Sequence, residues 1–135
     1  MIYIDSSAIV KLVIDEAESG ALRDWLAEML DPLVSSALAK VEVRQACRRI
    51  PDATTAQGAD LGAIQALLAI NIVPLSDGII DTAATLNLPG LPSLDALHLA
   101  SALAIQQDIR MLVTYDDRLG RAASASGFAV VAPGT

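Results

Sequence analysis

Five short apolar segments alternate with longer segments of helical periodicity, and this alternation restricts the fold more than any other feature. The expected strands lie at 2–4, 33–35, 71–75, 111–114 and 128–131. Strands that are separated by a helix need a crossover connection, so they pair in parallel. The sequence therefore predicts an α/β fold, a three-layer α/β/α sandwich with a mainly parallel five-stranded sheet, in a single domain spanning residues 1–135.

The expected helices begin at capping residues and end near Pro or Gly. They cover 6–14, 18–30, 36–49, 54–70, 76–86, 93–107 and 116–126. Ser6 or Ser7 is expected to cap the first of them. The helix at 54–70 is expected to bury the stripe Leu61, Ile64, Leu67 and Leu68, which has helical spacing.

The composition indicates an aliphatic core in a reducing compartment. The chain has 135 residues, of which 53% are hydrophobic and only 3% aromatic, which favours helices on a modest sheet. Its one cysteine, Cys47, excludes an intrachain disulfide and is expected to be a small buried residue. The N-terminus lacks the features of a signal peptide, and no apolar stretch has the length of a membrane span. We therefore expect a soluble cytoplasmic protein without membrane contact.

The net charge of -7 argues against binding to nucleic acid, because phosphate backbones favour clustered Lys and Arg. Bound divalent ions would offset part of this charge. The arginines are unevenly placed, with three at 44, 48 and 49 and two at 118 and 121. An acidic protein of this kind could also bind a basic protein partner.

Four acidic residues are expected at one edge of the sheet. Asp5 follows the first strand, Glu42 lies early in the helix after the second, and Asp116 follows the fourth. Asp95 lies in the first turn of an otherwise apolar helix. Ligands of parallel sheets bind beyond the carboxyl ends of the strands, where these acids converge.

Such a cluster needs cations, because neighbouring carboxylates repel one another. Hard oxygen ligands without Cys or clustered His select Mg²⁺ or Mn²⁺. Two such ions can activate water and stabilise both oxygens of a phosphodiester displacement. Taken singly, Asp5 and Asp116 could simply cap helices, Asp95 could support a helix N-terminus, and Glu42 could be a solvated side chain.

Four segments, MIYIDSSAIVKL, SSALAKVEVRQACRR, LPSLDALHLASALA and MLVTYDDRL, resemble in order and spacing the signature blocks of PIN-domain nucleases, specifically the VapC toxins of bacterial toxin-antitoxin pairs. The resemblance covers nearly the whole chain. It implies a metal-dependent endoribonuclease with the cluster Asp5, Glu42, Asp95 and Asp116, with Asp117 as an alternative fourth acid. It also implies that Ser6 and Thr114 stand beside the metal centre as ligands or supporting groups.

The same resemblance implies substrates and partners. Substrates would be structured RNA, tRNA or rRNA, cut to leave a 5′-phosphate and a 3′-hydroxyl. The partners would be a VapB-like antitoxin, lying in a groove formed by about residues 8–30 near Trp25, and a second copy in a homodimer. From their positions in the chain, Arg44 and Lys11 are candidates for contact with RNA phosphates, and His98 is expected to be a buried or supporting residue rather than a ligand.

Three alternatives compete with this interpretation of the residues. A response-regulator receiver domain would need paired acids after the first strand and a lysine after the fifth, whereas the last lysine here is Lys40. A PIN-like interaction module without catalysis is disfavoured by the presence of all four acids. The third alternative is a processing nuclease without a toxin role. A neighbouring gene that encodes an antitoxin would decide in favour of the toxin.

Overall fold

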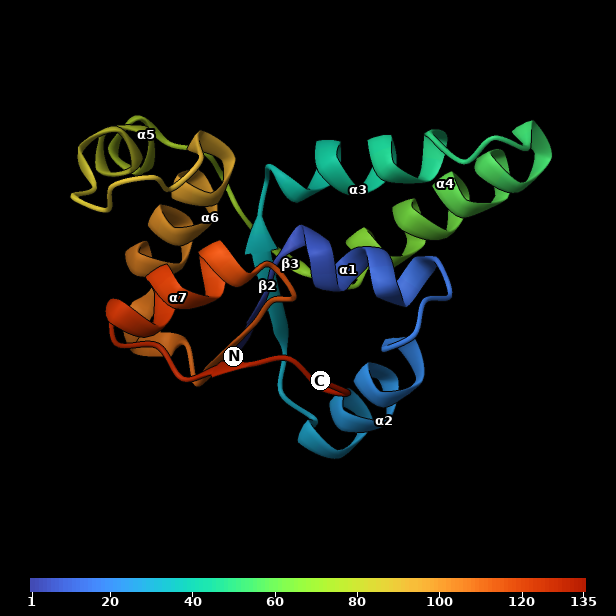
Figure 1. Ribbon diagram of the computed structural model, residues 1–135, viewed down its shortest axis with the longest axis horizontal. Helices are drawn as coiled ribbons and strands as arrows, with labels where there is room; N and C mark the ends of the chain where they lie inside the picture. Colours follow the sequence, from blue (N-terminus) through green and yellow to red (C-terminus); the bar gives the residue numbers. More distant parts are fainter.

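The computed structural model describes residues 1–135 and consists of five strands and seven α-helices (Figure 1). The strands are β1 (Ile2–Ile4), β2 (Leu33–Ser36), β3 (Asn71–Val73), β4 (Met111–Val113) and β5 (Val130–Val131). The helices are α1 (Ser6–Val13), α2 (Ser19–Met29), α3 (Ala39–Arg48), α4 (Ala53–Leu68), α5 (Asp77–Thr85), α6 (Ser93–Ala104) and α7 (Asp117–Ala125), with a 3₁₀ turn at Gln106–Asp108.

All strand pairs are parallel, and the sheet order is β3-β2-β1-β4-β5. The central strand β1 pairs Tyr3 with Val34 on one side and with Leu112 on the other. Every residue of β1 is buried, as expected for a strand covered on both faces. The order places the chain's first strand in the middle, so the loop after β1 opens at the centre of the sheet's carboxyl edge.

Helices cover both faces of the sheet and confirm the predicted three layers (Figure 1). Helices α1 to α4 pack against one face over a core that includes Ile2, Ile4 and Val43. Helices α6 and α7 pack on the other face around Tyr3 and Leu112, and α5 lies against α6. The alternation of side chains along β1 sends isoleucines to one core and tyrosine to the other. None of the helices has the length and apolar character needed to cross a bilayer.

The predicted stripe of α4 is only partly correct. Leu67 is buried, but Leu61 and Leu68 are 59% and 82% exposed. The buried face of α4 instead carries Ala56, Asp60, Ala63 and Leu67. The helix lies close to α3, and small side chains allow that approach while an ion pair fills the remaining space. Helical spacing alone admits more than one stripe, and the neighbouring helix selects which one is buried.

Several predicted helix starts also differ from the structure. Asp5, rather than Ser6 or Ser7, caps α1, because its carboxylate accepts a hydrogen bond from the Ala8 amide. Helix α3 begins at Ala39, and Ser36 ends β2 and accepts from the Leu38 amide. Helix α4 begins at Ala53, where Asp52 provides the cap. The predicted caps at Ser76 and Asp116 are confirmed.

Candidate active site at the carboxyl edge of the sheet

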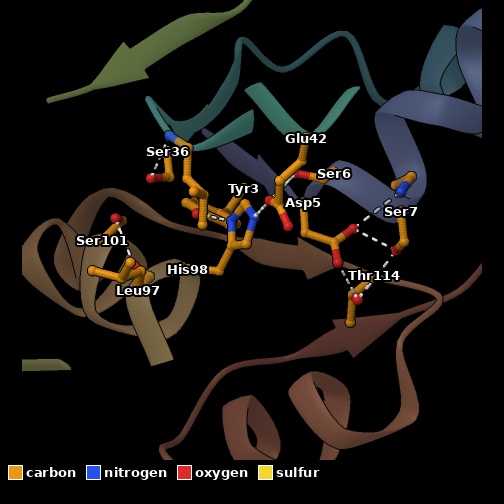
Figure 2. Close-up of polar contacts among 12 residues, drawn as sticks. Tyr3, Asp5, Ser6, Ser7, Ser36, Glu42, Leu97, His98, Ser101 and Thr114 are labelled. Atoms are coloured by element: carbon orange, nitrogen blue, oxygen red, sulfur yellow. Dashed lines mark hydrogen bonds and ion pairs between the residues drawn. The ribbon is translucent and has the colours of Figure 1, made fainter. Parts of the chain in front are cut away.

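Asp5 lies at the centre of the carboxyl edge, between the end of β1 and the start of α1 (Figure 2). Only 3% of its surface is exposed. Oδ1 accepts hydrogen bonds from the Ser7 hydroxyl at 2.7 Å and from the Ala8 amide at 3.0 Å. Oδ2 accepts from the Thr114 hydroxyl at 2.6 Å. Three donors thus fix the orientation of this carboxylate, and Oδ2 keeps capacity for a further partner.

Burial raises the pKa of Asp5, because a charged carboxylate is poorly solvated there. Hydrogen bonds from Thr114, Ser7 and Ala8 lower this pKa but do not cancel the effect of burial. No arginine or lysine neutralises Asp5. A bound cation would therefore stabilise its ionised form.

The Thr114 hydroxyl, predicted as a supporting group, connects two acids of the site. It donates to Asp5 and accepts from the Asp116 amide at 3.0 Å. Ser7 has a comparable role that the sequence did not reveal, since its hydroxyl donates to Asp5 and accepts from the Tyr115 amide at 2.9 Å. Because Ser7 and Tyr115 are far apart in the chain, only the packing of β1 beside β4 brings them together.

Glu42 approaches from α3 and is held by two donors through one of its oxygens (Figure 2). Oε1 accepts from the Ser6 hydroxyl at 2.6 Å and lies 2.7 Å from Nε2 of His98. Burial would raise the pKa of Glu42, but the hydrogen bonds from His98 and Ser6 outweigh it, so the pKa lies below its usual value. Oε2 accepts no such hydrogen bond and is available to a ligand.

His98 is a buried supporting residue, as predicted, with 2% of its surface exposed. Its Nδ1 lies 2.8 Å from the Tyr3 hydroxyl, and its Nε2 lies 3.0 Å from the Ser6 hydroxyl. Figure 2 shows the imidazole between Tyr3 and Glu42. Both ring nitrogens are engaged within the protein, so His98 has no free nitrogen for a metal ion.

Asp95 lies in the first turn of α6 and is half-buried. Burial raises its pKa, and the negative charges of Asp116, Asp5 and Glu42 raise it further, while His98 lowers it. No hydrogen bond contributes to this pKa. Asp95 therefore has no hydrogen-bond donor of its own, and the charges of the other three predicted acids act on it.

Asp116 and Asp117 have different surroundings. Asp116 is half-buried and caps α7, with Oδ1 accepting from the Arg118 and Leu119 amides. Its charge acts on Asp95 more strongly than that of any other residue. Asp117 is exposed and is absent from the charges that act on Asp95. The geometry favours Asp116 as the fourth acid of the cluster.

The donor set suits a hard divalent cation. Glu42 and Asp116 each retain an oxygen without a hydrogen-bond donor, and Asp95 has no donor at all. Oxygen ligands of this kind suit Mg²⁺ or Mn²⁺. No three His, Cys, Asp or Glu side chains are close enough to form a ready-made metal site. The four acids do not form a closed ligand set as they stand, so metal binding would require their side chains to move closer together.

The two cations expected at the RNA are both paired with carboxylates. Lys11 lies 2.8 Å from Glu18 and 4.8 Å from the centre of the Tyr115 ring. Arg44 forms a two-pronged pair with Asp60 through Nε and a terminal nitrogen, at 2.9 and 3.0 Å. Arg44 therefore joins α3 to α4 in this structure.

The chain is similar to known proteins over nearly its full length. The family model described as PIN domain matches residues 2–125. Ribonuclease VapC46 of Mycobacterium tuberculosis (strain H37Rv) is 42% identical over 98% of this chain and 97% of its own. Ribonuclease VapC35 from the same species is 43% identical over 99% of this chain and 98% of its own.

Solved structures share the fold at lower identity. VapC20 of M. tuberculosis, described as a Sarcin-Ricin loop cleaving toxin, has a TM-score of 0.72 at 19% identity and covers 98% of this chain and 100% of its own. FitAcB from Neisseria gonorrhoeae has a TM-score of 0.75 at 17% identity, with 98% of each chain covered. The family-model match and the relatives at 42% and 43% identity show that the chain belongs to the PIN-domain family, in the group of the VapC ribonucleases.

Proposed function

We propose that this protein is a Mg²⁺-dependent endoribonuclease that acts as the toxin of a toxin-antitoxin pair. The observation that carries the proposal is Asp95, a half-buried carboxylate whose pKa is raised by burial and by three neighbouring carboxylates, with no donor to stabilise it. Such a group costs free energy in a fold unless a cation compensates it. Asp5, Glu42, Asp95 and Asp116 would bind the metal, with Mn²⁺ able to replace Mg²⁺.

Divalent ions bound there would activate a water molecule and stabilise the charge on the oxygens of a scissile phosphodiester. The protein's own residues hold the ligands. Thr114 and Ser7 fix Asp5, and Ser6 and His98 fix one oxygen of Glu42. Hydrogen-bonding groups that hold a metal ligand in place orient its oxygens and strengthen metal binding.

For substrates and partners, the proposal follows the relatives. VapC20 is described as cleaving the Sarcin-Ricin loop, and a further fold neighbour is VapBC2 from Rickettsia felis, bound to a DNA fragment from their promoter. We infer that this protein, acting in the cytoplasm as one PIN domain, cleaves tRNA or rRNA, pairs with a VapB-like antitoxin and forms a homodimer. Arg44 and Lys11 could contact RNA only by giving up their carboxylate partners.

The test is cleavage of total RNA with Mg²⁺, with Mn²⁺ and with EDTA. We expect activity with either ion and none with EDTA. Asp5→Asn and Asp95→Asn should each abolish cleavage, since each removes charge from the metal site. Asp81→Asn, an exposed acid on α5, serves as the matched control and should retain full activity. Cleavage that persists in EDTA, or in Asp95→Asn, would disprove metal dependence.

RNA cleavage and growth of cells that express the protein together distinguish two alternative functions. A catalytically silent interaction module would leave RNA intact with every ion. A processing nuclease without a toxin role would cleave RNA but would not arrest growth when expressed alone. Growth arrest that a co-expressed neighbouring antitoxin gene relieves would support the toxin role.

A further inference from the structure

Two arginines on α7 line an open pocket that contains no carboxylate. Arg118 and Arg121 stand three residues apart, on one face of the helix. They line a pocket of about 380 Å³ together with Ala122, Ala125 and the loop from Leu88 to Leu91. The rest of the lining is uncharged, so these two guanidinium groups determine the pocket's electrostatic character.

Neither arginine has an acidic partner, which separates them from most cations of the chain. The protein has nine lysines and arginines. Lys11, Arg23, Arg44, Arg48 and Arg110 form ion pairs with carboxylates. The unpaired cations are Lys40, Arg49, Arg118 and Arg121, and only the last two line one pocket together with no acid. A positive pocket on a protein of charge -7 is suited to an anionic ligand.

The pocket adjoins the elements that carry two acids of the candidate active site. Arg118 is two residues from Asp116, the cap of α7. The loop from Leu88 to Leu91 leads directly into α6, whose first turn holds Asp95. Helices α6 and α7 pack against each other (Figure 1), and this loop faces α7 across the pocket. The pocket is thus lined by segments that directly adjoin Asp95 and Asp116 in the chain.

We propose that Arg118 and Arg121 bind a backbone phosphate of the RNA strand, next to the phosphodiester that is cut. Their planar guanidinium groups match phosphate oxygens, and the leucine and proline surface of the loop can contact ribose and base. This subsite rests on the proposed ribonuclease function and defines where its substrate lies. Lys11 and Arg44 need not contact RNA in this arrangement.

The test is the salt dependence of RNA binding. The Asp5→Asn background prevents cleavage, and fluorescence anisotropy with a labelled oligouridylate from 50 to 200 mM KCl gives the slope of log K against log salt. Each phosphate contact on single strands contributes about 0.7 to this slope, so loss of the one phosphate contact in Arg118→Gln with Arg121→Gln should reduce it by about 0.7. The matched control is Lys40→Gln with Arg49→Gln, which removes two unpaired exposed cations elsewhere and should leave the slope unchanged.

Lysine substitutions at both arginines provide the rescue, because they keep the charges and lose the planar geometry. They should restore most of the slope while leaving weaker binding. In the active protein, the glutamine pair should raise KM with kcat unchanged. An equal change of slope in the control pair, or no change in the glutamine pair, would overturn the subsite. Failure of the wild-type protein to cleave RNA would instead remove the proposed function and leave the binding result standing.

A second, independent observation concerns the only histidine of the chain. Tyr3 is fully buried, and its hydroxyl lies 2.8 Å from Nδ1 of His98. Nε2 of the same ring lies 2.7 Å from a Glu42 carboxylate oxygen, which accepts hydrogen bonds and does not donate them. We infer that this hydroxyl donates to Nδ1 of His98 and so fixes the tautomer in which Nε2–H donates to Glu42. His98 is then a positioning residue that holds Oε1 of Glu42 and leaves Oε2 free for a metal ion.

Because there is only one imidazole, ¹⁵N NMR of the metal-free protein reads the tautomer directly. We expect protonated Nε2 and unprotonated Nδ1 in the wild-type chain, and a mixture of tautomers in Tyr3→Phe, which removes one hydroxyl without changing the packing. Mn²⁺ affinity should fall about 10-fold or more in His98→Ala and partly recover in His98→Gln, whose amide can donate to Glu42. Ser101→Ala, a buried hydroxyl elsewhere on α6, is the control. Protonated Nδ1 in the wild-type chain, or unchanged affinity in His98→Ala, would refute this role.

Discussion

The Thr114 hydroxyl donates a 2.6 Å hydrogen bond to Oδ2 of Asp5, joining the ends of β4 and β1 across 109 positions of the chain. The hydroxyl oxygen of Thr114 also accepts a hydrogen bond from the Asp116 amide, so this one side chain positions two acids of the candidate active site. The parallel pairing of Ile4 with Val113 sets this contact, because it brings the two strand ends level.

Thr114→Val should therefore weaken both the fold and the metal site. It keeps the shape of the side chain but leaves the buried Asp5 oxygen and the Asp116 amide without their partner, a loss of about 1–3 kcal/mol in the free energy of unfolding. Urea denaturation and Mn²⁺ titration measure the two effects. Thr114→Ser keeps the hydroxyl and should retain metal affinity. Equal Mn²⁺ affinities in the valine and serine variants would contradict this role.

Asp5→Asn should stabilise the metal-free protein at neutral pH while abolishing its response to metal. Burial raises the pKa of Asp5 in the folded chain, so its contribution to stability is full below the unfolded value and is lost as pH rises through the folded value. Asparagine has no such loss. Melting temperatures from pH 4 to 8 should thus separate increasingly in favour of the variant.

Millimolar Mn²⁺ should reverse that order, because it binds only the folded wild-type site. The control for this experiment is Asp81→Asn, which should follow the wild-type curve with and without the ion. A wild-type melting temperature that Mn²⁺ leaves unchanged would count against a metal site at Asp5.

Asp60→Asn should lower the melting temperature by separating α3 from α4. The guanidinium of Arg44, with help from Arg48, holds the pKa of Asp60 below its usual value. The contribution of Asp60 is therefore present at neutral pH and is lost as pH falls through its folded pKa. The difference in melting temperature between the wild-type protein and Asp60→Asn should shrink in strong acid. Thermal melts from pH 2 to 7 measure it. A constant difference over that range would point to packing rather than charge.

Leu67→Ala and Leu68→Ala should differ sharply although the residues are neighbours. Leu67 is 7% exposed, and its truncation should cost about 2–4 kcal/mol of unfolding free energy. Leu68 is 82% exposed, and its truncation should change that energy by less than about 0.5 kcal/mol. Chemical denaturation at low protein concentration measures both values. Similar losses in the two variants would mean that α4 presents a different face to the core.

The sequence by itself determined the layered parallel fold and gave the four acids predicted to form the metal site. Alternating apolar segments and capped helices require parallel crossovers, and parallel strands bring Asp5 and Asp116 to one edge. Asp95 could be singled out because it interrupts an apolar helix, and the burial found around it accounts for its raised pKa. These are local patterns, which the order of residues along the chain carries directly.

Only the tertiary structure decided what each polar side chain contacts. It showed that Ser7 holds Asp5, that His98 connects Tyr3 to Glu42, and that Arg44 is paired with Asp60. It also buried Ala63 in α4 while exposing Leu68. Such choices depend on distances between elements that are far apart in sequence. Periodicity indicates which faces of a helix are apolar, but only the packing of neighbouring helices settles which face is covered and which charges meet.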